Sequence, residues 1–181
     1  MKHKLLIILA SLFMFTASPA FAQDKVSHQR NELVKVENEN IDEQYEVFDD
    51  PYDGQHHYYL SVGHLGMGDE VLQVLFDPIC ELFIPLGNNL AEALAMLEQL
   101  KEFYKSTPGT TMEVQGCLAL GFPTDRLETV TVTARKVLLR RKLEFSLQRE
   151  GYIRATYVGK SDFSSLVRGV KVYGKIHPKE F

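Results

Sequence analysis

Three histidines, His56, His57 and His64, lie near Asp53 and are the first residues in the chain that suggest chemistry. Imidazole and carboxylate groups can bind a metal ion or act as a general base. On an extended strand His56 and His64 would stand about 27 Å apart. The chain also contains no H-E-x-x-H motif and no C-x-x-C pair. We therefore expect solvated or hydrogen-bonded histidines, no metal and no catalytic residues, with a His-based site assembled in space as the alternative.

Two glycine-rich stretches could suggest a nucleotide cofactor, and neither fits one. Gly159-Lys160-Ser161 has the end of a phosphate-binding loop, but Arg154 stands where that loop requires its first glycine. Gly63-x-x-Gly66-x-Gly68 leads into a β-prone run rather than a helix. No G-x-S-x-G motif occurs either. We expect turn glycines and no cofactor.

Charge is distributed unevenly along the chain. Residues 23–113 hold 18 acidic and 5 basic side chains, whereas residues 114–181 hold 6 acidic and 13 basic ones. Basic residues that we expect on neighbouring strands are Arg135, Lys136, Arg140, Arg141, Lys142, Arg149 and Arg154. Such a sheet face could bind an anionic envelope polymer, an acidic protein or the chain's own acidic segment, unless the two halves interleave and cancel. Nucleic acid is not expected, because the chain is acidic overall and lacks stacking motifs beside the basic run.

Aromatic residues next to the histidines suggest a second binding surface. Tyr58 and Tyr59 are adjacent in a β-prone run, so strand alternation sends them to opposite faces. One of them is then expected in the core, and the other could stack on a sugar or anchor a partner protein.

The two cysteines, Cys80 and Cys117, both lie in apolar segments. In an exported chain two such thiols can pair, and we predict a disulfide that closes a loop of about 37 residues. Two buried free thiols are the alternative.

One helix is strongly predicted, over residues 90–105. Asn89 can cap it, Glu92 follows at capping-box spacing, and leucines and alanines recur on one stripe at helical period. The sequence Thr107-Pro108-Gly109 ends it.

Strands are predicted for most of the rest of the chain, at residues 58–62, 71–76, 79–84, 112–120, 127–137, 143–148 and 152–158. Ser161 could open a short helical turn that ends at Gly169, followed by a last strand over residues 170–176. Because one helix stands among hairpin-like runs, the predicted fold is α+β, a mainly antiparallel sheet of about 6–8 strands with one main helix packed on a face.

The stretch of residues 135–149 is harder to phase. Alternation places Val137, Leu139 and Leu143 on one face, whereas Val130 and Val132 have the opposite parity. A bulge at Arg135-Lys136 would re-phase the strand, and a second helix is the alternative.

The first 22 residues have the three parts of a cleavable secretory signal: a basic start, an apolar run over residues 5–15 and an A-x-A site at residues 20–22. The run is too short for a membrane span, and no cysteine near the site could accept a lipid. We expect a secreted or periplasmic product with an acidic, largely flexible leader at residues 23–50 and a single domain at residues 51–181.

These features favour a non-catalytic binding module of the bacterial cell envelope, whose partner is a protein or an anionic envelope polymer. The residues expected to bind are Tyr58, Tyr59, Arg135, Arg140, Arg141, Arg149 and Arg154. A small exported hydrolase with a His site, or a protein inhibitor of a hydrolase, is the alternative.

Overall fold

The computed structural model describes residues 27–38, 43–64, 66–67, 80–149 and 152–178. In chain order its elements are β1 (Asn31–Asn38), β2 (Glu43–Asp49), β3 (Tyr58–His64), β4 (Gly66–Met67), β5 (Glu81–Gly87), α2 (Leu90–Phe103), β6 (Thr111–Ala119), β7 (Glu128–Val137), β8 (Arg140–Arg149), β9 (Tyr152–Gly159) and α3 (Lys160–Ile176). The predicted strand over residues 71–76 lies outside the described residues.

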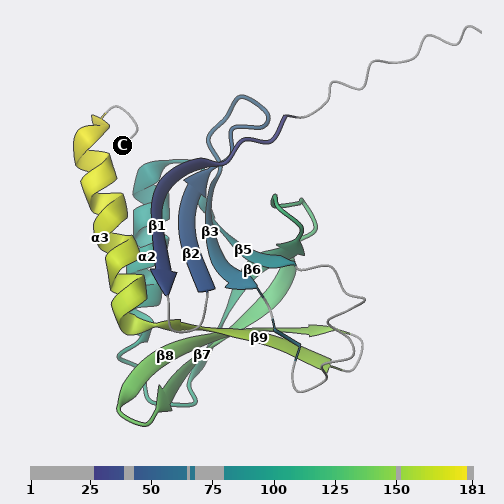
Figure 1. Cartoon of the computed structure of the whole chain (residues 1–181), viewed down its shortest axis with the longest axis vertical. Helices are drawn as coiled ribbons and strands as arrows, with labels where there is room; N and C mark the ends of the chain where they lie inside the picture. The colour runs from purple at the N-terminus through teal and green to yellow at the C-terminus, as the bar shows by residue number, and fades with distance from the viewer. Residues whose placement is uncertain (1–26, 39–42, 65, 68–79, 150–151, 179–181) are drawn as a thin grey trace, which may run out of the picture.

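The strands form one antiparallel sheet in the order β1-β2-β3-β5-β6-β7-β8-β9-β4. The sheet bends strongly, so that β7, β8 and β9 run across the direction of β1, β2 and β3 (Figure 1). β4 follows β3 closely in the chain yet pairs with β9, which brings the two parts of the bent sheet together. Each half of the chain runs through a series of antiparallel strands and ends in a helix.

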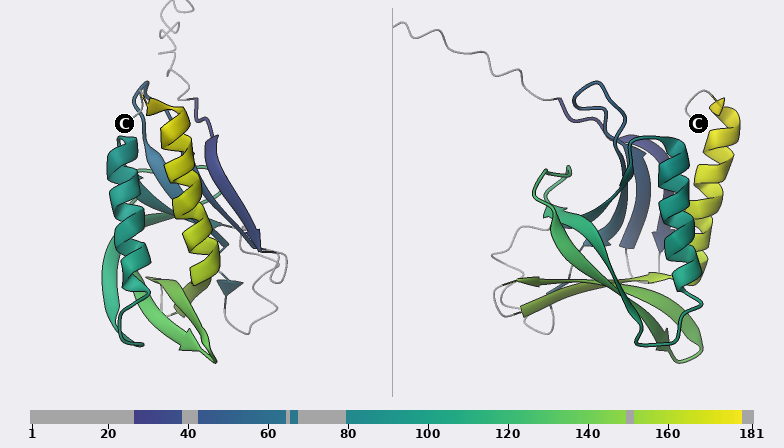
Figure 2. Two further views of the ribbon diagram at one scale, coloured as in Figure 1. Left: turned by 90° about the vertical axis from the view of Figure 1, so that its left-hand side faces the viewer. Right: turned by 180° about the vertical axis from the view of Figure 1, so that it is seen from behind.

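Both helices lie on the same side of the sheet (Figure 2). α3 packs against β1 and β2, α2 packs against β5 and β3, and the helices contact each other. The main core fills the space between them, with Tyr45, Leu60, Leu97, Phe145 and Phe163 among its fully buried side chains. The predicted α+β fold, a mainly antiparallel sheet with a helix on one face, is confirmed.

The predicted helix over residues 90–105 is α2, which ends at Phe103. Asn89 caps it as the sequence indicates, since the backbone N–H of Glu92 donates to Asn89 Oδ1 at 2.9 Å. The Glu92 side chain accepts in return from the backbone N–H of Asn88, one residue before the N-cap. The Tyr104 hydroxyl, just past the helix, donates to the carbonyl of Val158 at 3.0 Å and ties α2 to the end of β9.

The predicted short turn and last strand after Ser161 are wrong, because residues 160–176 form the single helix α3. Gly169 does not end it. A Cβ at this position would come within 2.3 Å of the Val34 side chain, so the glycine lets the helix approach β1 closely. The buried stripe of α3 consists of Phe163, Leu166, Val167 and Val170.

The acidic segment expected to be a flexible leader contains two strands of the sheet, β1 (Asn31–Asn38) and β2 (Glu43–Asp49). Tyr45 and Val47 are fully buried in the main core, while Glu46 and Phe48 face the other side of the sheet. Glu46 and Phe48 therefore share the face opposite the helices, and β1 and β2 are two strands of the folded sheet.

Residues 128–149 form the hairpin of β7 and β8, so strands, not a second helix, are the correct interpretation. The bulge predicted at Arg135-Lys136 is absent, because β7 and β8 pair without a register shift from Thr131 to Val137. The apparent change of phase arises because Val137, Leu138 and Leu139 are exposed at the tip and do not belong to the core pattern.

Candidate anion-binding pocket

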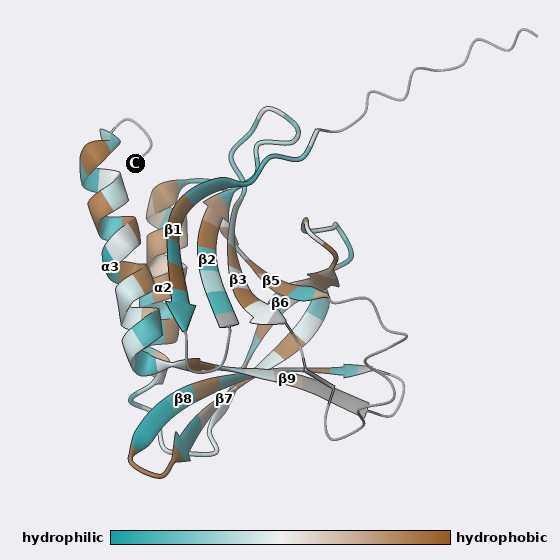
Figure 3. Ribbon diagram, in the orientation of Figure 1, coloured by the Kyte–Doolittle hydropathy of each residue, from teal (hydrophilic) through white to brown (hydrophobic). Residues whose placement is uncertain are grey.

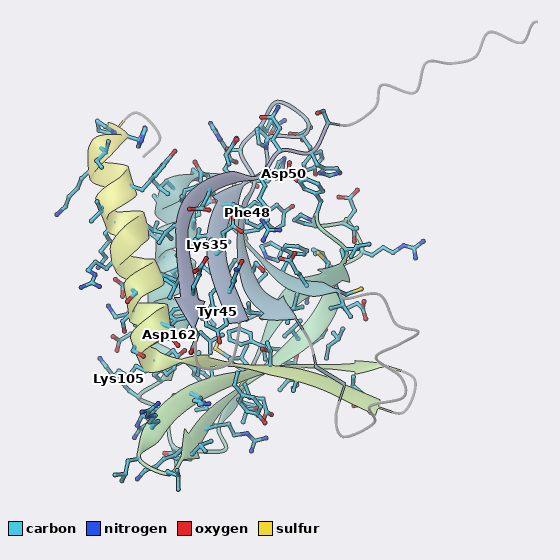
Figure 4. The ribbon with its side chains drawn as sticks, in the orientation of Figure 1. Lys35, Tyr45, Phe48, Asp50, Lys105 and Asp162 are labelled. Atoms are coloured by element: carbon cyan, nitrogen blue, oxygen red, sulfur yellow. The ribbon has the colours of Figure 1, made fainter. Side chains whose placement is uncertain are left out.

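A pocket of about 640 Å³ opens where the end of β1, the start of β8, the end of β9 and the first turn of α3 meet. Its lining residues are Glu37, Asn38, Arg140, Arg141, Lys142, Tyr157, Gly159, Lys160, Ser161 and Asp162. Figure 4 shows Asp162 at the start of α3, where the helix approaches the sheet. Four of the lining side chains are basic and two are acidic, so the pocket has an excess of positive charge.

Chain continuity, strand pairing and one hydrogen bond hold these segments together. β9 leads directly into α3, with Gly159 as the N-cap, and Lys142 is the cross-strand partner of Gly159. The end of β1 is fixed beside them by a hydrogen bond from the Asn38 amide to Asp162 Oδ2 at 3.0 Å. The walls of the pocket therefore come from four elements, β1, β8, β9 and α3.

The N-terminus of α3 adds to the positive potential. Gly159 has no side chain with which to cap the helix, so the first-turn N–H groups keep their partial positive charge toward the pocket. Asp162 in the first turn offsets part of this charge, but its oxygens already accept hydrogen bonds from Asn38 and the Ser161 hydroxyl. Lys160 is exposed at the rim.

The basic side chains of the pocket differ in their roles. One guanidinium nitrogen of Arg141 donates to the carbonyls of Tyr104 and Ser106, at 2.7 and 2.9 Å, and so holds the chain that follows α2. Lys142 lies over the ring of Tyr157, 5.8 Å from its centroid. Arg140 is exposed. Arg140 and Lys160 are the cations best placed to meet a ligand.

Arg135, predicted as a binding residue, lies on β7 and pairs with Glu144 on β8 through hydrogen bonds of 2.8 and 3.1 Å. Burial would raise the pKa of Glu144, but hydrogen bonds from Arg135 and Tyr157 outweigh it and lower that pKa. The bond to Glu144 also raises the pKa of Tyr157. Arg135 thus has a structural partner and does not line the pocket.

The remaining predicted binding residues do not join this site. Tyr58 is buried, and its ring stacks on His56. Tyr59 is half-buried against Phe48 on the sheet face opposite the helices, and burial raises its pKa. Arg149 ends β8 far from the pocket and Arg154 lies on β9, and their side chains are outside the described residues.

The sequence interpretation did not identify Lys160, Ser161, Asp162 or Glu37 as part of a site. The signal was present in Gly159-Lys160-Ser161, where Gly159 was interpreted as a turn glycine rather than as part of a phosphate-binding loop, and Ser161 as the start of a short helical turn. A strand that ends at a glycine and continues into Lys-Ser-Asp is also typical of a helix start. The contribution of β1 depends on tertiary pairing and has no local signature.

The predicted histidine cluster resolves into separate His–Asp pairs. His56 Nδ1 lies 2.8 Å from Asp49 Oδ2, and His57 Nε2 lies 2.9 Å from Asp53 Oδ1. The side chain of His64 is outside the described residues. Among the described residues, no group of three or more histidine, cysteine, aspartate and glutamate side chains could hold a metal ion.

A second polar cluster lies on the sheet face opposite the helices and was not predicted. Arg30 donates to Glu46 at 2.7 Å and to Glu81 at 2.8 and 3.3 Å. Its guanidinium lies 4.7 Å from the ring centroid of Phe48 and 5.7 Å from that of Phe83. Burial works against the charge on Arg30, but the bonds to Glu81 and Glu46 hold its pKa above the ordinary value. Its contacts make Arg30 a structural clamp.

The disulfide predicted between Cys80 and Cys117 is not present in the structure, where both thiols are free. The strand register explains this. Cys117 on β6 lies directly opposite Phe83 on β5. Phe83 is three residues after Cys80, so the two cysteines are offset by about 10 Å along the strand direction. A disulfide needs Cα atoms within about 7 Å.

Comparisons with known proteins found no family model, no curated protein and no solved structure that matches this chain. Within the described residues, no helix has the length and apolar character that a membrane-crossing helix requires.

Proposed function

We propose that this protein is a non-catalytic binding module of the bacterial cell envelope, secreted or periplasmic, whose basic pocket binds an anionic group such as a phosphate or carboxylate. The observation that carries the proposal is the pocket of about 640 Å³ that gathers Arg140, Arg141, Lys142 and Lys160 at the N-terminus of α3. The export signal expected at residues 1–22 supports the compartment.

Physical chemistry favours an anion here for two reasons. Guanidinium and ammonium groups supply charge-assisted hydrogen bonds, which are about twice as strong as neutral ones. The helix N-terminus directs N–H groups and positive potential toward the same space. Glu37 and Asp162 limit the affinity for simple ions, so the preferred ligand is expected to contact the rim cations Arg140 and Lys160 together.

The lining residues favour binding over hydrolysis. They include no histidine or cysteine, and the Ser161 hydroxyl donates to Asp162 at 3.2 Å with no imidazole among the lining groups to activate it. The His–Asp pairs formed by His56 and His57 lie outside this pocket, because none of their residues lines it.

Isothermal titration with sodium tripolyphosphate at low salt tests the proposal. Arg140→Ala and Lys160→Ala are each expected to weaken binding about tenfold, with a smaller salt dependence than that of the parent chain. Lys175→Ala is the matched control, because Lys175 lies in the last turn of the same helix, about 22 Å from its start. Equal affinities for all three variants would place binding elsewhere and refute the proposal.

A further inference from the structure

The tip of the β7–β8 hairpin exposes consecutive apolar side chains. Leu138 is 90% exposed and Leu139 is 92% exposed, and Val137 beside them is about half exposed. Figure 3 shows this tip as a hydrophobic end between two hydrophilic strands. Single exposed apolar residues are common on protein surfaces, but three consecutive exposed apolar residues at a protruding turn indicate a binding surface.

The backbone at the tip strengthens this observation. Leu138 has a φ of 56°, and it is the single non-glycine residue with positive φ among the residues that the structure describes. Glycine and asparagine adopt this conformation readily in hairpin turns, whereas a leucine is disfavoured there. A leucine in this conformation with 90% of its surface exposed gains no packing in the isolated molecule.

Charge surrounds the apolar tip on both strands. Residues 135–142 read Arg-Lys-Val-Leu-Leu-Arg-Arg-Lys, with five basic and no acidic residues. Arg135 is paired with Glu144, and the Arg141 guanidinium is held by the carbonyls of Tyr104 and Ser106. Lys136, Arg140 and Lys142 are therefore the cations of the hairpin best placed to meet an anionic surface.

We infer that the β7–β8 hairpin docks on an anionic lipid bilayer, with Val137, Leu138 and Leu139 entering the interfacial region and the flanking basic residues contacting lipid phosphates. The inference rests in part on the proposed function, because Arg140 and Lys142 also line the pocket, which takes up one headgroup phosphate. Shallow apolar insertion combined with basic residues is the physical basis of peripheral membrane binding.

The shape of the surface selects a bilayer over a protein partner. Protein interfaces of normal stability bury about 800 Å² on each side around a broad apolar centre. Here the apolar part consists of three residues at a protruding turn, encircled by cations. An anionic bilayer suits such a tip, because it deforms around a small protrusion and presents negative charge around an apolar interior.

The chain has no tryptophan, so a single tryptophan reports on one site. Leu139→Trp in the full chain is expected to show a blue-shifted emission and quenching by brominated lipids when phosphatidylglycerol–phosphatidylcholine vesicles are added. Leu120→Trp is the matched control. Leu120 is 70% exposed and follows the end of β6 that lies away from the hairpin tip. The emission of this tryptophan is expected to stay as in water.

Vesicle sedimentation of the full chain measures how much the apolar tip contributes to vesicle binding. The double variant Leu138→Asn and Leu139→Ser is expected to bind phosphatidylglycerol vesicles at least tenfold more weakly, while Leu120→Ser binds like the parent. Asparagine is compatible with positive φ, so this variant keeps its fold, which circular dichroism checks. The apolar run of residues 5–15 is common to all these chains and contributes equally.

The outcomes separate this inference from the proposed function. Tryptophan at position 139 that remains in water while the protein sediments with vesicles overturns hairpin docking. A dimer that dissociates on Leu138→Asn substitution, seen by sedimentation velocity without lipid, also overturns it and assigns the tip to a second copy of this chain. Binding of tripolyphosphate that is unchanged in the tip variant, together with loss of vesicle binding, supports both statements. Weaker tripolyphosphate binding in Arg140→Ala and Lys160→Ala, together with unchanged vesicle binding in the tip variant, supports the pocket and overturns hairpin docking.

Discussion

Replacing Arg30 with methionine is expected to destabilise the protein by about 3 kcal/mol. Arg30 precedes β1 and binds Glu46 on β2, Glu81 on β5 and the carbonyl of Gly121, so one side chain fastens the N-terminal segment to two strands and a loop. Methionine keeps much of the aliphatic volume. The substitution therefore removes mainly the charge and its hydrogen bonds.

The magnitude follows from burial. The side chain of Arg30 is 27% exposed, and those of Glu46 and Glu81 are 11% and 19% exposed. Exposed ion pairs contribute about 0–1 kcal/mol, whereas removing one partner of a buried pair costs about 3–5 kcal/mol because a buried charge is left behind. Arg30 leaves two such carboxylates, but its partial exposure admits water, which gives a value near the lower end of that range, about 3 kcal/mol.

Urea unfolding followed by circular dichroism measures this loss as a shift of midpoint at constant slope. Arg168→Met on the exposed side of α3 is the control and is expected to change stability by less than about 0.5 kcal/mol. Adding Glu46→Gln to Arg30→Met should recover part of the loss, because it removes one of the abandoned charges. A loss below about 1 kcal/mol for Arg30→Met would refute the reasoning, since it would show that water screens the cluster as it does at an open surface.

Three further results are expected. Gly169→Ala should lower stability by about 1–3 kcal/mol in urea, because its Cβ would overlap Val34, and Val34→Ala should restore part of it. In the native protein Cys80 should react with Ellman's reagent well before Cys117, which is buried and whose pKa burial raises, with two free thiols after unfolding in urea. Glu144 has a lowered folded-state pKa, so its pairing with the 46% exposed Arg135 stabilises the fold by about 0.5–1 kcal/mol at pH 7, and this is lost as the pH falls through that pKa. Glu144→Gln should therefore match the parent's stability only at low pH.

The sequence predicted correctly the elements whose signals come from residues close together in the chain. The stripe and the N-cap at Asn89 give α2, and β-branched runs give β7, because these signals depend on near neighbours. β1 and β2 were missed because nine acidic residues in residues 23–50 resemble the composition of a disordered segment, although Tyr45 and Val47 alternate correctly. Burial of one strand face is a tertiary property that composition does not contain.

The errors at the C-terminal end have a different cause. Gly169 and the neighbouring valines favour a turn and a strand locally, yet Phe163, Leu166, Val167 and Val170 recur at helical spacing and form the buried stripe of α3. Contact with β1 decides the outcome, since only a residue without a Cβ fits beside Val34. Tertiary contacts also explain why the basic residues were predicted but the pocket was not. The walls of the pocket come from β1, β8, β9 and α3, which only the folded sheet brings together.

The charge asymmetry of the sequence is offset only in part by the fold, where α3 places basic residues such as Lys171 against α2 of the acidic half. Among the described residues, the ion pairs of the first half, such as those of Arg30 and His56, stay within that half, and Arg135 pairs with Glu144 within the second. Within this described part of the chain, Lys171 with Glu98 is the one ion pair that joins the two halves.

This separation has a direction in space. The acidic end that holds Asp50 lies at the opposite end of the molecule from the β7–β8 tip (Figures 1 and 4). A molecule with this charge distribution approaches an anionic surface with its basic end first, because the acidic end is repelled while the basic end is attracted. Arg140 follows the apolar tip directly in the chain and also lines the pocket, so steering, insertion and headgroup binding are compatible with one docking geometry.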